Sequence, residues 1–229
     1  MVENQSFSLQ ILNINPEPIG IFTLPVEKHL NYKKSLQLIE KKAPKELRQN
    51  FPAEKYTEHI CNNYKQNILN QFQTLLDLKK ELKLMILAYI KSIGHICEEV
   101  VITDAWLNNS SKNSILGYHY HANSYISGNY FINFNNEIHT QLNFINDRVL
   151  KNNSAPNIDT PKSPDVKNIY NANYIDVNAK EGQVFLWRSH NVHGYNVPNK
   201  GDERLTLSFN SMPKNCIDPL NRYSFSVVD

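Results

Sequence analysis

The chain has 229 residues, of which 24 are basic and 22 acidic, and 41% of all residues are hydrophobic. A chain of this length forms one domain or a closely packed pair of domains, with a substantial buried core. The formal net charge of +2 is spread along the sequence without a basic run, which argues against a nucleic-acid partner.

A membrane span and a disulfide framework are both unexpected. The longest apolar run, residues 84–90, is far shorter than the roughly 18 residues that a membrane span needs. The first residues lack the cationic and apolar regions of a secretory signal. The 3 cysteines are odd in number and form no C-x-x-C pair. We expect a cytoplasmic protein without membrane contact.

The first half of the sequence has mainly helical patterns. After a short strand pair at 9–14 and 19–24, residues 26–42 carry apolar side chains at helical spacing, and Pro44 follows. A longer helix is expected over 64–93, where apolar residues recur every three or four positions. Both helices are amphipathic and are therefore expected to pack against a sheet.

From residue 99 onward the hydrophobic period changes from helical spacing to two. Short segments rich in Val, Ile, Tyr, Phe and Thr alternate with Asn, Pro and Gly, a pattern typical of an antiparallel sandwich or barrel. Residues 147–168 contain several prolines and few aliphatic side chains, so they are expected to form a long loop, a candidate lid.

Three histidines in this half suggest a metal site. His119 and His121 stand two residues apart at the start of a strand-like segment, where their side chains would share one face. His193 follows a later strand, and a barrel can bring distant strands together. Such a facial set leaves open positions on a metal ion. His190 is the alternative third ligand, although its position fits a surface residue better.

Arg204 begins the segment RLTLSFN, in which Arg204, Thr206 and Ser208 share a strand face. A guanidinium inside a barrel needs an anion, and its planar fork matches a carboxylate. The anion is either a ligand or a structural carboxylate such as Asp104 or Asp176.

Taken together, three motifs carry a resemblance to a known family. They are HxHxNSxxSGxYxxN, then F-x-W followed by a histidine, then R-x-T-x-S-F-N. In this order they resemble the 2-oxoglutarate- and Fe(II)-dependent oxygenases related to the prolyl hydroxylases, over roughly residues 106–210. The resemblance implies an α+β, mainly β fold: a double-stranded β-helix (jelly roll, cupin-like) with N-terminal helices on one sheet. Residues 1–229 would form one oxygenase domain, with helical support and N-terminal strands in 1–98 and the jelly-roll core in 99–229.

The resemblance also implies roles for particular residues. His119 and His193 would be the first and distal ligands of Fe(II), and Arg204 with Thr206 would hold the distal carboxylate of 2-oxoglutarate. Further residues would line the pocket or face inward: Trp106, Asn108, Asn129 and Phe131, of which Asn108 and Asn129 are expected to bind the cofactor.

The chain departs from the family pattern at His121, where such enzymes usually carry Asp or Glu. Either three neutral imidazoles (His119, His121 and His193) bind the iron, or His121 does not ligate and water or chloride takes its place.

The implied activity uses Fe(II), 2-oxoglutarate and O2 to oxidise a C–H bond and releases succinate and CO2. The substrate would be a small molecule or an amino-acid or peptidyl group, and the sequence specifies neither it nor the oligomeric state. One alternative is a three-histidine cupin-type dioxygenase without 2-oxoglutarate, in which Arg204 binds the substrate. Another is a non-catalytic jelly-roll binding module with structural histidines.

Overall fold

The structure, a computed structural model, describes residues 17–51, 54–61, 67–146, 172–195, 197–217, 222 and 224–227. Its helices and 3-10 turns are α1 (Val26–Lys42), η1 (Lys45–Leu47), α2 (Ile68–Gln71), η2 (Gln73–Leu75) and α3 (Leu76–Ser92). The strands of its first half are β1 (Gly20–Thr23), β2 (Arg48–Asn50), β3 (Thr57–Ile60), β4 (Val100–Ser110), β5 (Leu116–His119) and β6 (Ile126–Asn133). Those of its second half are β7 (Asn143–Ile145), β8 (Tyr174–Asp176), β9 (Gln183–Arg188), β10 (His193–Tyr195), β11 (Arg204–Pro213), β12 (Asn215–Ile217) and β13 (Ser224–Ser226).

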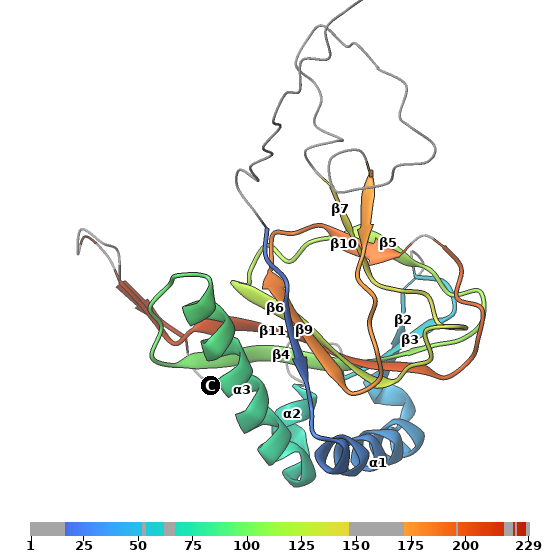
Figure 1. The fold of residues 1–229 in the computed structure, drawn as a ribbon. Coiled ribbons are helices and arrows are strands. Elements are labelled where there is room, and N and C mark those ends of the chain that lie inside the picture. Colours follow the sequence, from blue (N-terminus) through green and yellow to red (C-terminus); the bar gives the residue numbers. More distant parts are fainter. Residues whose placement is uncertain are drawn as a thin grey trace, which may run out of the picture.

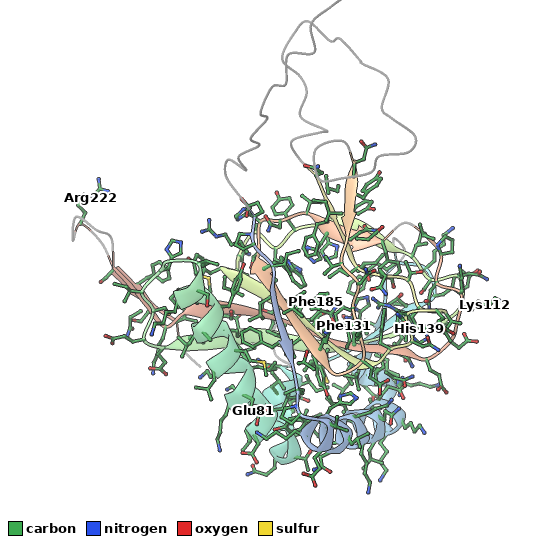
Figure 2. All side chains as sticks on the ribbon, in the orientation of Figure 1. Glu81, Lys112, Phe131, His139, Phe185 and Arg222 are labelled. Atoms are coloured by element: carbon green, nitrogen blue, oxygen red, sulfur yellow. The ribbon has the colours of Figure 1, made fainter. Side chains whose placement is uncertain are left out.

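Two antiparallel sheets form the body of the fold (Figure 1). The larger sheet has seven strands in the order β1-β9-β6-β11-β4-β3-β2, and the smaller has four in the order β5-β10-β7-β8. Aromatic side chains of both sheets pack together between them, among them Phe131 and Phe185 of the larger sheet (Figure 2) and Phe144 of the smaller. This is the double-stranded β-helix that the family resemblance implied, so the mainly β fold class is confirmed.

The two faces of the larger sheet differ in chemistry because side chains alternate along each strand. On β11, Leu205, Leu207 and Phe209 are buried in the large apolar cluster that includes the helices. Complete burial of one such leucine contributes about 2 kcal/mol. The intervening residues of β11 are polar and face the space between the sheets. Figure 1 shows α1, α2 and α3 on the outer side of the larger sheet, as the amphipathic patterns predicted.

The first predicted helix is confirmed, and the second is confirmed only over its later part. Helix α1 spans Val26–Lys42, and the Ala43 N–H closes its last turn on the Ile39 carbonyl before Pro44. The second helix was expected over 64–93 without a break. Within the described residues, the Asn67 side chain caps α2, but Phe72 is extended (φ −118°, ψ 114°), so the long helix α3 begins only at Leu76. The helix is therefore interrupted at Phe72, although the apolar spacing continues and no Pro or Gly marks the interruption in the sequence.

The period-two segments anticipated β4, β6, β7, β8, β9 and β11, whereas β2, β3, β10, β12 and β13 were missed. Residues 19–24 form β1 as expected, but it pairs with β9; residues 9–14 and the loop 147–168 lie outside the described part of the chain. Strands β2 and β3 are short and polar, and they are recognisable only because β3 adds to the edge of β4. No helix in the described part is long and apolar enough to cross a bilayer.

Close contact between β5 and β10 brings the H-x-H segment near His119 together with the later segment that contains His193. The register places His193 opposite His119. Gly194 makes this approach possible, since a Cβ there would lie 2.7 Å from the Leu116 carbonyl oxygen. Real Cβ atoms do not approach backbone oxygen so closely, and a side chain would therefore push β10 away from β5.

We expect Gly194→Ala to destabilise the protein, because the added methyl group collides with backbone and not with a flexible side chain. Overpacking of this kind costs about 1–3 kcal/mol. Urea unfolding measures the loss. Gly117→Ala in the facing strand is the matched control, since nothing lies within 4 Å of its added Cβ. Equal free energies of unfolding for both variants would contradict this account of the β5–β10 contact.

Candidate metal centre and active-site cavity

The three predicted histidines meet between the sheets, although not in the way the sequence suggested. His119 is the last residue of β5, and His193 is the first residue of β10. His121 was expected to share a strand with His119, but it lies in the turn beyond β5, where its backbone N–H donates to the Ser189 carbonyl at 2.9 Å. The turn, and not strand alternation, therefore directs His121 toward the other two rings.

The ring geometry fits a single metal ion. One nitrogen of each of His119, His121 and His193 lies within 4.8 Å of the other two. The ring centroids are 4.5 Å apart for His119 and His193, 5.1 Å for His119 and His121, and 5.2 Å for His121 and His193. Imidazoles that bind one ion at a metal–nitrogen distance of about 2.1 Å have centroids roughly 4.5–5.3 Å apart for angles between about 90° and the tetrahedral value. His190, the alternative ligand, is not part of this cluster in the described residues.

Two of the histidines have the tautomer that metal ligation requires. The Nδ1–H of His119 donates to the Gly117 carbonyl, and that of His193 to the Asn191 carbonyl, each at 2.8 Å. A neutral imidazole that donates from Nδ1 keeps the lone pair of Nε2 free. Backbone carbonyls commonly orient ligating histidines in this way.

The surroundings of His121 differ from those of the other two rings. Its Nδ1 lies 3.3 Å from Nδ2 of Asn210. The same amide nitrogen donates to Asp104 at 2.6 Å, and the Asn210 Oδ1 accepts a hydrogen bond from the Ser127 hydroxyl at 2.7 Å.

Burial favours the neutral form of two of the three imidazoles, His121 and His193. Loss of solvent, with a smaller contribution from His119, lowers the pKa of His193 to about 3. The same two causes lower the pKa of His121 to about 4, against an opposing effect of the Asp104 carboxylate. Neutral imidazole is the form that binds a metal ion, so the burial favours ligation.

The histidines line a cavity of about 270 Å³. Asn108 and Asn129, which were predicted as cofactor residues, also line it, together with Trp106. The Asn108 amide is engaged: its Oδ1 accepts from the Trp106 indole at 2.9 Å and its Nδ2 donates to Ser208 at 2.7 Å. The Asn129 Oδ1 is buried and has no hydrogen-bond partner in the described part of the chain, so it remains available to a ligand.

Strands β2 and β3 bring residues to the cavity that sequence reasoning missed. Phe51, Glu54 and His59 lie in its wall, and the His59 ring is hydrogen-bonded to the Glu54 carboxylate. The position of His59 beside Asn108 depends on the pairing of β3 with β4, which the short polar segment around His59 does not indicate.

Arg204 is buried next to the cavity but does not line it. Its Nε donates to the Thr140 carbonyl at 3.2 Å, and its guanidinium carbon lies 4.8 Å from the ring centroid of Tyr195 and 5.4 Å from that of Phe134. Its Nη2 has no hydrogen-bond partner among the described residues. No carboxylate of the described residues lies within 4 Å, so the predicted alternative partners Asp104 and Asp176 do not neutralise this cation.

Thr206 follows Arg204 on the same face of β11 and is buried. Its hydroxyl lies 3.4 Å from Nδ2 of Asn108, which links it to the cavity wall. The predicted site residues therefore form two groups. The three histidines, Asn108 and Asn129 line the cavity, whereas Arg204 and Thr206 are buried beside it.

The free energy of unfolding of the metal-free protein should fall as the pH drops from about 6.5 toward 4. The pKa of His193 is lower in the folded than in the unfolded chain, so the unfolded state binds more protons in this range. Each such histidine contributes a slope of up to about 1.4 kcal/mol per pH unit. Urea unfolding at a series of pH values should give a shallower slope for His193→Gln, whereas Tyr120→Phe, an exposed neighbour, should keep the original one. Parallel curves for His193→Gln and the unmodified protein would refute this assignment.

Part of the sequence matches the model of a known family of metal-dependent oxygenases. The model of a family described as "Putative 2OG-Fe(II) oxygenase" matches residues 104–210. None of the curated proteins matches the chain.

Solved structures with a similar fold have low sequence identity. A prolyl-4-hydroxylase of Pseudomonas putida is 11% identical, with a TM-score of 0.55 over 85% of this chain and 92% of that one. The non-heme alpha ketoglutarate dependent epimerase SnoN from nogalamycin biosynthesis is 13% identical, with a TM-score of 0.61 over 87% and 77%. HygX of Streptomyces hygroscopicus, solved with nickel, 2-oxoglutarate and hygromycin B, is 12% identical, with a TM-score of 0.53 over 86% and 83%. The fold is shared with these structures, and residues 104–210 of this chain are similar to the family described as putative 2OG-Fe(II) oxygenases.

Proposed function

We propose that this protein is a 2-oxoglutarate-dependent Fe(II) dioxygenase that oxidises a C–H bond of its substrate. The observation that carries the proposal is the combination of three converging histidines with a nearby buried guanidinium that has no anionic partner among the described residues. Bound Fe(II) and 2-oxoglutarate would supply the oxidising chemistry, using O2 and releasing succinate and CO2. The protein's residues would bind and orient the metal ion, the cosubstrate and the substrate, and would exclude water from the site.

The metal site in this proposal is the cluster of His119, His121 and His193. Carbonyl groups fix His119 and His193 with their Nε2 lone pairs free, and burial lowers the pKa of His121 and His193. Nitrogen ligands of this kind suit a ferrous ion, and a facial set leaves room for a chelating cosubstrate. No residue in the proposed ligand set is acidic, so the protein would leave the iron more positive than a His-x-Asp site does.

Arg204 and Thr206 would hold the distal carboxylate of 2-oxoglutarate. An isolated buried cation costs several kcal/mol, and a bound carboxylate would offset that cost. The Nη2 of Arg204 is free to donate, while Thr140, Phe134 and Tyr195 fix the orientation of the guanidinium. A carboxylate would therefore meet a preorganised donor.

Asn129 and Asn108 complete the proposed cofactor pocket in different ways. The Asn129 amide faces the cavity with an unpaired oxygen, whereas Asn108 acts by fixing Trp106 and Ser208. The cavity is large enough for a small molecule or for an amino-acid or peptidyl side chain, and we propose such a substrate. We further propose that the whole chain forms one oxygenase domain and acts in the cytoplasm.

Arg204→Met should strongly weaken 2-oxoglutarate binding while leaving metal binding intact. Loss of one charge-assisted carboxylate contact inside a protein costs about 2–5 kcal/mol, which corresponds to roughly 30-fold to 5,000-fold weaker binding. Anaerobic titration of the Fe(II)-loaded protein with 2-oxoglutarate, followed by the visible charge-transfer band of the chelate, measures this affinity. Succinate release should disappear in parallel.

Leu205→Met, on the opposite face of β11, is the matched control and should retain the band. Normal 2-oxoglutarate turnover by Arg204→Met would refute the anchor role of Arg204. If the unmodified protein binds Fe(II) and consumes O2 without 2-oxoglutarate, it is instead a three-histidine dioxygenase of the cupin type. If it does not bind Fe(II), it is a binding module with structural histidines.

A further inference from the structure

The Asn210 side chain can adopt only one orientation in its surroundings. One end of its amide lies 2.6 Å from the Asp104 carboxylate, whose other oxygen accepts from the Thr103 hydroxyl at 2.7 Å. An ionised carboxylate only accepts hydrogen bonds, so the amide nitrogen must face it. The hydroxyl of Ser127, 2.7 Å from the Asn210 Oδ1, can donate to that oxygen. Asp104 and Ser127 together therefore fix the amide.

The fixed amide determines the tautomer of His121. Nδ2 of Asn210 donates one hydrogen to Asp104 and directs the other at Nδ1 of His121, 3.3 Å away. A neutral imidazole that accepts at Nδ1 carries its proton on Nε2. Its one lone pair is then occupied, and neither nitrogen is free to bind a metal ion. This is the reverse of His119 and His193, which donate from Nδ1 to carbonyl oxygens.

We infer that His119 and His193 are the direct metal ligands, and that Asp104 and Asn210 hold His121 in the cluster as an N–H donor outside the coordination shell. This inference rests on the proposed iron site and specifies its ligands. Asp104 and Asn210 are positioning residues that act through His121. The third protein-side position would be open to water or a small anion, and the N–H of His121 would help to hold that group.

Ligation by His121 would require a rearrangement that the carboxylate opposes. To release Nε2, the ring must move its proton to Nδ1, which then faces the N–H of Asn210. The amide must turn over to relieve this contact, and its oxygen would then lie against the Asp104 carboxylate. Two acceptors at that distance repel each other, so the ionised Asp104 keeps His121 out of the metal shell.

Nitrogen-15 NMR of the unmodified protein loaded with Zn(II) tests the inference directly. Two-bond correlations to the ring carbons' protons distinguish a protonated from a metal-bound ring nitrogen. We expect Nδ1–H with metal-bound Nε2 for His119 and His193, and Nε2–H without a metal shift for His121. A metal-shifted nitrogen on His121 would overturn the inference.

Metal affinities of variants provide a second, independent readout. In Co(II) titrations followed by the visible absorption of the ion, His119→Ala and His193→Ala should bind about 100-fold or more weakly. His121→Ala should lose less than about tenfold, as for a residue outside the coordination shell. Equal losses for all three variants would contradict the assignment.

Asp104→Asn examines the positioning role. An amide at position 104 can donate to Asn210, which allows the Asn210 amide to turn and His121 to ligate. In this background, removal of His121 should cost about 100-fold in Co(II) affinity, far more than in the unmodified protein. An unchanged effect of His121→Ala would show that Asp104 does not control the ring. Thermal unfolding followed by circular dichroism checks that each variant is folded, and the NMR test does not depend on the variants.

Failure of this inference can be separated from failure of the proposed function. If the unmodified protein binds neither Zn(II) nor Co(II) at the histidines, the metal site itself is wrong. If the metal binds and all three rings ligate, the proposed function stands and only the role of His121 is overturned.

Discussion

The alternation of side chains along β11, at the centre of the larger sheet, is the constraint on which the site depends. Leu205, Leu207 and Phe209 are buried against the helix-covered layer, and this burial fixes the register with β4 and β6. A slip by one residue would exchange the two faces and place leucines in the cavity. The apolar half of the strand thus determines where Arg204, Thr206 and Asn210 point.

Some buried polar atoms between the two sheets lack a hydrogen-bond partner within the described part of the protein. Among the residues that the structure describes, these atoms include Nη2 of Arg204, Oδ1 of Asn129 and Nε1 of Trp187. Each unsatisfied group costs about 1–3 kcal/mol, more for a charged one. Functional sites are the usual place for such deficits, because a ligand can supply the missing partner. The unpaired polar atoms around the cavity therefore lower the stability of the fold, and the same atoms can bind a ligand.

The three histidines look equivalent in the sequence but differ in their hydrogen bonds. Backbone carbonyls accept from Nδ1 of His119 and His193, whereas a side-chain amide donates to Nδ1 of His121. This difference gives a physical meaning to the departure from the His-x-Asp pattern. The carboxylate that the motif lacks at residue 121 is present on β4 as Asp104, one hydrogen-bonded side chain away.

The sequence by itself determined the mainly β class, helix α1 and most strands, because these depend on local periodicity and on proline and glycine positions. It also identified His119, His121, His193 and Arg204, whose spacing and order carry the family motif. The interruption near Phe72, the strands β2 and β3, and the position of His121 in a turn were not predictable from local patterns.

Tertiary structure alone decided which residues meet in the cavity. Glu54 and His59 reach it through the pairing of β3 with β4, and Asp104 acts on His121 through Asn210, a residue far away in the sequence. Among the described residues, tertiary structure also keeps Arg204 apart from Asp104 and Asp176, and the sequence had left both as possible partners. Hydrogen bonds and ion pairs extend only a few ångströms, so they depend on strand register and on side-chain direction, which a linear pattern of residue types does not contain.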